Sequence, residues 1–190
     1  MRLFFFVIVF IFNTQISTKA DDIKEFEIEG LTIGNSLLNF FSEEDIKKSD
    51  MNYYKKKEYK TVAFNNSPII KTYDWLQITY KTNDRKYNIV SVDGVLSFKN
   101  NYKDCLVKKE KISKEIQSSF NIIPDNYGGP HAADKSGKSI FETTEWRVDN
   151  GLIIVQCIDW SKEMEKQYFD HLKVWTGTYE FFNWVSNNPY

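Results

Sequence analysis

The chain has 190 residues, of which 42% are hydrophobic, 16% are aromatic and 27% are charged, with a formal net charge of −1 at pH 7. This length is enough for one globular domain with a substantial core. The near-equal numbers of basic and acidic residues argue against nucleic acid as a partner, because a protein that follows a phosphate backbone needs a basic surface.

Residues 1–20 predict a secretory signal peptide. Arg2 precedes an unbroken apolar run from Leu3 to Phe12, and small residues lead up to Ala20. The run is shorter than the roughly 20 residues that span a bilayer, but it suits the apolar centre of a signal. A buried N-terminal strand and an uncleaved anchor are the alternatives. The sequence therefore predicts a periplasmic or secreted protein whose remaining residues, 21–190, form a single domain without stable membrane insertion.

Two helix starts are predicted in the first part of that domain. Asn35 is a good N-cap for the apolar stretch after it. Ser42, with Asp45 three residues later, resembles a capping box, and the acids between them favour the positive end of a helix.

Alternating residues then predict strands over about 72–98. The period of two in TYDWLQITYKT is that of a half-buried strand, and KYNIVSV is its expected partner. Asp93-Gly94 predicts a turn, with VLSF as a short third strand after it.

Residues 102–119 predict an amphipathic helix that carries Cys105. The chain's other cysteine, Cys157, falls in an apolar strand pattern. In an exported protein two cysteines predict one disulfide, here between a helix and a strand, and two free buried thiols are the alternative.

A loop rich in Pro, Asn and Gly is predicted at 124–137. Long irregular segments of this kind often bind ligands, and Tyr127 and His131 are the candidate binding residues. The letters Gly137-Lys138-Ser139 that follow match the end of a phosphate-binding loop. The glycine that such a loop needs five residues earlier is Ala132, so a turn before a strand is predicted instead.

The clearest hairpin is expected around Asn150-Gly151, a dipeptide that favours a type I′ turn. Counting outward from that turn pairs Val148 with Ile153, Trp146 with Val155 and Thr144 with Cys157. A further strand at 169–175 and a closing helix after Thr178 complete the chain. The predicted fold class is α+β with antiparallel sheets, built from two helix-then-three-strand units at about 35–98 and 102–176.

No catalytic constellation is found in the sequence. Its two histidines, His131 and His171, lie in no metal-binding or hydrolase motif. The sequence predicts no cofactor, no metal and no catalytic residue, hence no enzyme.

Several stretches together resemble a family of small exported bacterial proteins that carries no known activity. These stretches are EFEIEGLTIGNSLLNFFSEEDIKK, YDWLQITYK, the helix cysteine and WRVDNGLIIVQCIDW. A weaker resemblance is to BamE-type envelope modules, in which a step like Gly30-Leu31-Thr32 opens a helix. It implies a small α+β envelope module, although the lipid-bearing cysteine and the Gly-x-Pro of that type are missing here.

Two functions follow as hypotheses. The first is a non-enzymatic periplasmic protein that binds or scaffolds an envelope protein partner. The alternative is a module that binds a glycan or small molecule through the 124–137 loop, supported by the aromatic surplus. An enzyme is the less favoured third possibility.

Overall fold

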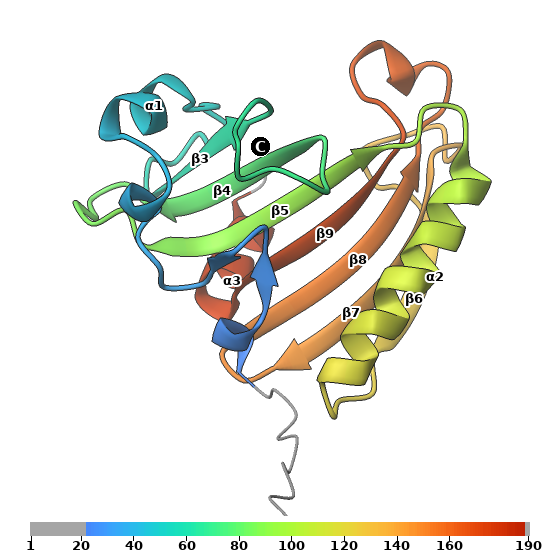
Figure 1. Ribbon diagram of the computed structural model, residues 1–190. Helices are drawn as coiled ribbons and strands as arrows, with labels where there is room; N and C mark the ends of the chain where they lie inside the picture. Colours follow the sequence, from blue (N-terminus) through green and yellow to red (C-terminus); the bar gives the residue numbers. More distant parts are fainter. Residues whose placement is uncertain (1–21, 189–190) are drawn as a thin grey trace, which may run out of the picture.

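The computed structural model describes residues 22–188, and the predicted signal peptide at 1–20 lies outside these residues. Its centre is a seven-stranded antiparallel sheet with the strand order β3-β4-β5-β9-β8-β7-β6 (Figure 1). The strands of this sheet are β3 (Tyr59–Phe64), β4 (Trp75–Lys81), β5 (Ile89–Ser97), β6 (Asp125–Pro130), β7 (Ile140–Val148), β8 (Gly151–Asp159) and β9 (His171–Thr178).

Shorter elements surround this sheet. The two-residue strands β1 (Glu27–Ile28) and β2 (Leu31–Thr32) form a small hairpin of their own. The α-helices are α1 (Glu43–Lys48), α2 (Tyr102–Ser119) and α3 (Tyr179–Asn187), and single 3₁₀ turns are η1 (Ile23–Glu25), η2 (Leu37–Asn39) and η3 (Met164–Lys166).

The predicted α+β class is wrong, because the fold is mainly β with three short helices. The two predicted helix-then-three-strand units are also wrong, since β5 of the first pairs along its length with β9 of the second. Register pairs run from Ser91–Gly177 to Ser97–His171 and merge both halves into one sheet. Strand order is a tertiary property, which the periodicity of single strands does not contain.

Strand β5 runs straight through the Asp93-Gly94 pair that predicted a turn. Gly94 is required by close packing instead, since a Cβ there would lie 2.7 Å from the Tyr73 ring. The predicted third strand is therefore the end of β5. Asp93 becomes a strand residue on one face of the sheet.

The hairpin β7–β8 forms, but its predicted register is wrong by two residues. Val148 pairs with Gly151, so the connecting residues are Asp149 and Asn150, and Trp146 lies opposite Ile153. Asn150 has the expected positive φ of 67°, but Gly151 is a strand residue. A side chain at Gly151 would overlap Ile23 and the Gly177 carbonyl. A slip of two keeps every side chain on its predicted face.

Helix starts agree in part with the sequence. Ser42 caps α1 as predicted: its Oγ accepts a hydrogen bond from the Asp45 N–H at 3.1 Å. The helix expected after Asn35 is only the turn η2, capped by Ser36. The predicted helix at 102–119 is confirmed as α2, and Thr178 caps α3.

The predicted irregular loop at 124–137 is also corrected in part, because residues 125–130 form β6. This strand pairs with β7 from Asp125–Glu145 to Pro130–Ile140 and makes one edge of the sheet. This strand was not predicted from the sequence because it contains Gly128 and Gly129, and glycine is generally depleted in strands. Gly137-Lys138-Ser139 directly precedes β7, as predicted.

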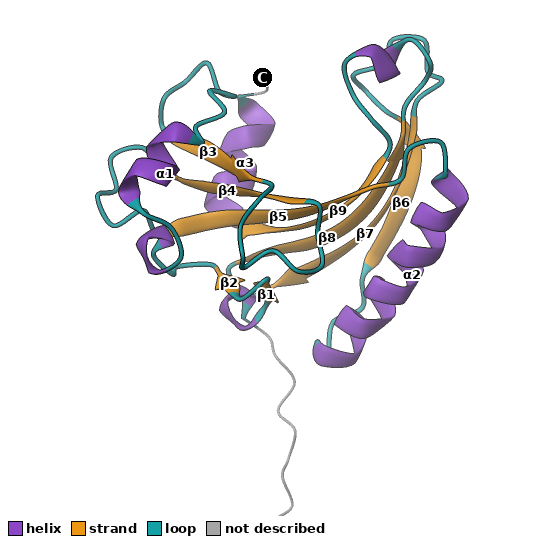
Figure 2. Cartoon of the chain, turned by 45° about the horizontal axis from the view of Figure 1, so that its top comes forward, coloured by secondary structure: helices purple, strands orange, loops and turns teal. Residues whose placement is uncertain are grey.

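The two faces of the sheet are covered differently. Helix α2 and the β1–β2 hairpin pack on one side, the α2 face, over a core that includes Trp146, Val155 and Val174. Helix α3 packs on the opposite side, the α3 face, over Ile154 and Trp175. Figure 2 shows the curved sheet between α2 and α3. Successive strand residues alternate between these faces.

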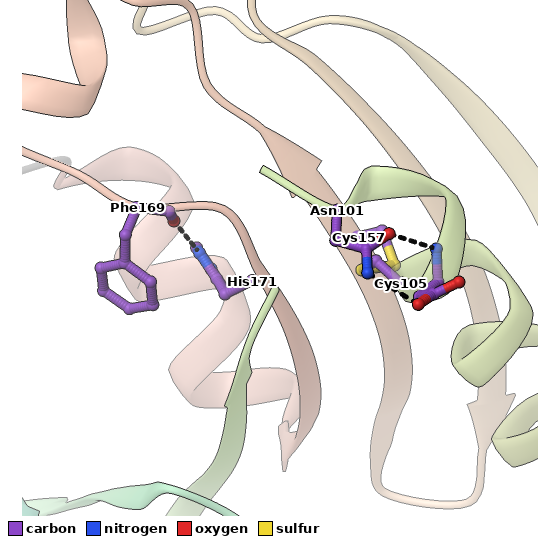
Figure 3. Close-up of a disulfide and its surroundings, with 6 residues drawn as sticks. Asn101, Cys105, Cys157, Phe169 and His171 are labelled. Atoms are coloured by element: carbon purple, nitrogen blue, oxygen red, sulfur yellow. Dashed lines mark hydrogen bonds between the residues drawn. A yellow bond between two sulfur atoms is a disulfide. The ribbon is translucent and has the colours of Figure 1, made fainter. Parts of the chain in front are cut away.

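The predicted disulfide is confirmed. Cys105 of α2 is bonded to Cys157 of β8, with a Cα–Cα distance of 6.0 Å, and both residues are buried in the α2-face core (Figure 3). The bond ties the first turn of α2 to the middle of the sheet. It closes a loop between residues separated by 52 positions.

Removing this disulfide should lower the free energy of unfolding. By loop-closure entropy, the Cys105→Ala/Cys157→Ala variant should lose about 4 kcal/mol. Urea unfolding of both proteins without reductant measures the difference, and reduced wild-type protein is the control. Equal unfolding midpoints in the oxidised wild type and the double variant would contradict a stabilising role.

Candidate functional site

The α3 face carries a groove of about 870 Å³, which we call the sheet groove. Its floor is made by side chains of β3, β4, β5 and β9 together with Ile158 of β8. Tyr53 borders one end, and the segments around His131 and Trp160 border the other. This volume lies in the range of pockets that hold small organic molecules.

A second hollow of about 200 Å³ adjoins the sheet groove beneath α3. Four residues line both: Tyr53, Gln77, Asp93 and Lys173. Phe181 and Trp175 close the smaller hollow on the α3 side. The four shared residues therefore stand where the two hollows meet.

Opposite charges lie at this junction. The Asp93 Oδ2 atom of β5 lies 3.8 Å from the Lys173 Nζ atom of β9. Burial raises the pKa of Asp93 to about 6, although the Lys173 ammonium and a side-chain hydrogen bond with Ser91 act in the opposite direction. Asp93 is thus ionised at neutral pH.

This carboxylate is incompletely satisfied. Its Oδ1 atom is buried and has no hydrogen-bond partner within residues 22–188. The neighbouring Gln77 Nε2 donates a hydrogen bond to the Tyr53 hydroxyl at 3.0 Å. Buried polar atoms are normally paired, so an unpaired one requires an explanation.

Aromatic side chains make the walls of the sheet groove. Trp75 packs edge-on against Phe169, with ring centroids 4.8 Å apart. Trp160 stacks on Tyr168 at 4.5 Å and also contacts His131 at 4.4 Å. Such rings offer large, rigid apolar surfaces to the face of a ligand.

Hydrogen bonds fix the tautomers of the two groove histidines. The His131 Nδ1 atom accepts the Ala133 N–H at 3.2 Å, so neutral His131 carries its proton on Nε2. His171 does the reverse, because its Nδ1–H donates to the Phe169 carbonyl at 2.7 Å (Figure 3). Its Nε2 is then an acceptor. The pair presents one donor and one acceptor.

Both histidines are neutral at pH 7. Burial lowers the pKa of His171 to about 4 and also lowers the pKa of His131. Asp93 and Lys173 are accordingly the charged residues among those that line the sheet groove. Their charges cancel, and the groove has no net charge at neutral pH.

A polar network holds the two loops that carry His131 and Trp160. The Asp134 carboxylate accepts hydrogen bonds from the Ser139 N–H and hydroxyl, and Ser139 Oγ accepts the Ser161 N–H at 2.9 Å. The hydrogen bond from Ser139 holds the pKa of Asp134 well below its usual range. Ser139, the last residue of the Gly-Lys-Ser motif, thus joins the two loops.

The structure separates the two predicted ligand-binding residues. His131 lines the sheet groove, whereas Tyr127 lies in β6 and donates its hydroxyl proton to Glu145 at 2.8 Å. Two tryptophans, Trp75 and Trp160, line the groove as well.

Sequence reasoning missed Asp93 and Lys173. A turn was expected at Asp93, while Lys173 resembled an ordinary solvent-facing residue of an amphipathic strand. The available signal was a charged residue, Asp93, in the middle of a strand pattern. Its partner Lys173 lies 80 positions later in the chain, so the sequence did not indicate the pair.

Comparisons with known proteins give no relative: no family model, no curated protein and no solved structure matches the chain. The resemblances to small exported bacterial proteins and to BamE-type modules stay predictions from the residues quoted for them.

No helix within residues 22–188 is both long and apolar enough to cross a bilayer. Within the same range, no group of three or more His, Cys, Asp or Glu side chains is arranged to hold a metal ion.

The neutral state of His171 predicts a pH effect on stability. Its folded pKa of about 4 lies below the unfolded value of 6.5, so only the unfolded chain gains this proton as pH falls between them. His171 therefore lowers stability as pH falls from about 6.5 to 4. In His171→Gln, the loss of unfolding free energy from pH 7 to pH 4.5 should be smaller by about 2 kcal/mol.

Urea unfolding of both proteins at the two pH values measures this difference. Other titrating groups, including Asp93, whose raised pKa acts in the opposite direction, are common to both proteins and largely cancel. The same pH dependence in wild type and variant would show that His171 is not held neutral.

Proposed function

We propose that this is a non-enzymatic binding protein that holds a small amphipathic molecule in the sheet groove. The observation that carries this proposal is a groove with aromatic walls and a small set of polar groups at its floor. That combination is typical of ligand sites, in which apolar surface supplies affinity and a few polar groups fix orientation.

The proposed ligand contacts come from several separate segments. Trp75, Trp160 and Tyr168 offer ring surfaces, while His131, Gln77 and the Asp93–Lys173 pair offer hydrogen bonds. The 124–137 segment takes part through His131. Tyr127, which lies against Glu145, is left out of the proposed site.

Export to the periplasm or the exterior is part of the proposal. The Cys105–Cys157 disulfide supports it, because such bonds persist in oxidising compartments. The apolar run within residues 1–20 supports it independently.

Scaffolding of an envelope partner is less favoured as a proposal. Within residues 22–188 the exposed large apolar side chains come from separate elements, for example Val107 of α2 and Ile123 after it. Two others, Met51 and Tyr168, line the sheet groove itself.

A neutral fluorescent probe tests the proposed function. N-phenyl-1-naphthylamine should bind the folded protein with a stoichiometry of one, and its emission should rise when it enters the groove. In Ala133→Trp the new side chain enters the groove, because Ala133 is an exposed residue that lines it. Probe affinity should fall at least about tenfold, equivalent to about 1.4 kcal/mol.

Ala132→Trp is the matched control, since Ala132 is also exposed but is not among the residues that line the groove. Its probe affinity should stay within about twofold of wild type. No binding to the wild type, or equal loss in both variants, would contradict binding in the groove.

A further inference from the structure

The Asp93 and Lys173 side chains are too far apart to form a direct hydrogen bond with each other. Charge-assisted N–H···O bonds measure about 2.7–2.9 Å, whereas the Nζ and Oδ2 atoms are 3.8 Å apart. Both side chains are partly accessible, with 14% of Asp93 and 31% of Lys173 exposed. The pair is therefore open to a third group from the groove.

The opposite charges of Asp93 and Lys173 determine which kind of ligand group can bind between them. A ligand cation bound to the Asp93 carboxylate would be repelled by the Lys173 ammonium beside it. A ligand anion bound to Lys173 would likewise be repelled by Asp93. Moving a charged group from water into this site would also add a large desolvation penalty. A hydroxyl group both accepts and donates, and it carries no charge.

We infer that the ligand of the sheet groove is a neutral, hydroxyl-bearing amphipathic molecule, one hydroxyl of which lies between Lys173 and Asp93. This hydroxyl accepts a hydrogen bond from the Lys173 ammonium and donates one to the Asp93 carboxylate. The inference rests on the proposed function, because it names the class of molecule that the groove holds.

The surroundings of the pair agree with this class. The remaining polar groups of the groove are neutral hydrogen-bonding groups, among them Gln77 and the two histidines of opposite tautomer. The aromatic rings of Trp75 and Trp160 then contact the apolar part of the same molecule. In this arrangement the Asp93–Lys173 pair recognises the hydroxyl of the ligand, and the aromatic rings bury most of the ligand's apolar surface.

Four naphthalene probes of nearly equal size test the inference. They are 2-naphthol, 2-methoxynaphthalene, which has no donor, 2-naphthoate, an anion, and 2-(aminomethyl)naphthalene, a cation. Competition with N-phenyl-1-naphthylamine at pH 7 gives their affinities. We expect 2-naphthol to bind about tenfold more tightly than each of the others, since hydrogen bonds to charged groups are the stronger ones.

The double variant Asp93→Leu/Lys173→Met tests the residues. It leaves no unpaired charge in the groove, so it should fold, which urea unfolding verifies. The affinities of 2-naphthol and 2-methoxynaphthalene for this variant are then measured directly from the change in their own fluorescence. Its preference for 2-naphthol over 2-methoxynaphthalene should fall to within about twofold. Lys81→Met is the control, because Lys81 pairs with Glu180 outside the groove, and it should keep the full preference.

The outcomes separate the inference from the proposed function. A wild-type protein that binds no probe contradicts both. Probe binding without a preference for 2-naphthol, tighter binding of a charged probe, or an unchanged preference in the double variant overturns the inference alone.

The source of the hydroxyl is distinguished with one more ligand. Tighter binding of 2-naphthyl β-glucoside than of 2-naphthol would support the inference with a saccharide as ligand. The reverse order would support it with a simple alcohol.

Discussion

The pairing of β5 with β9 is the constraint on which the rest of the structure depends. It joins strands from the two halves of the chain over seven register pairs and converts two potential hairpin sheets into one curved sheet. Both faces then extend across β4, β5, β9 and β8 without interruption. The sheet groove exists only because this surface is wide enough to be left partly uncovered by α3.

The same pairing also assembles the charged pair. Asp93 lies opposite Trp175, and Val95 lies opposite Lys173, so Asp93 and Lys173 are diagonal neighbours on the α3 face. Their neighbours in sequence, Gly94 and Val174, point to the α2 face. A one-residue slip of either strand would place its charged residue in the α2-face core, which explains why the register is strongly fixed.

Local features were predictable from the sequence where short-range chemistry decides them. The Ser42 cap, helix α2, the alternation in β4 and the faces of β7 and β8 follow from residues within a few positions of each other. The disulfide was also predictable, because a chain with two cysteines has one intramolecular pairing available.

Long-range contacts decide what the sequence did not show. Gly94 signals a turn by composition, but the Tyr73 ring requires a glycine within a strand. Similarly, Gly151 is fixed by Ile23 from the N-terminal segment. The candidate site belongs to this second group: its lining comes from segments spread between residues 51 and 173, and only His131 was identified beforehand.

The α3 face itself gives a reason to attribute the charged pair to binding rather than to folding. Beside the groove, polar residues satisfy each other: Thr61 and Thr79 share a hydrogen bond of 2.8 Å, and the Trp175 indole donates to Ser91. Two residues further along β5 and β9 on the same face, the Asp93 Oδ2 and Lys173 Nζ atoms are 3.8 Å apart. Apolar residues in their place would often be at least as stable. Asp93 Oδ1 and the Trp160 Nε1–H, both from residues that line the sheet groove, are among the buried polar atoms without a partner within residues 22–188. Departures from self-consistency of this kind are expected at functional sites.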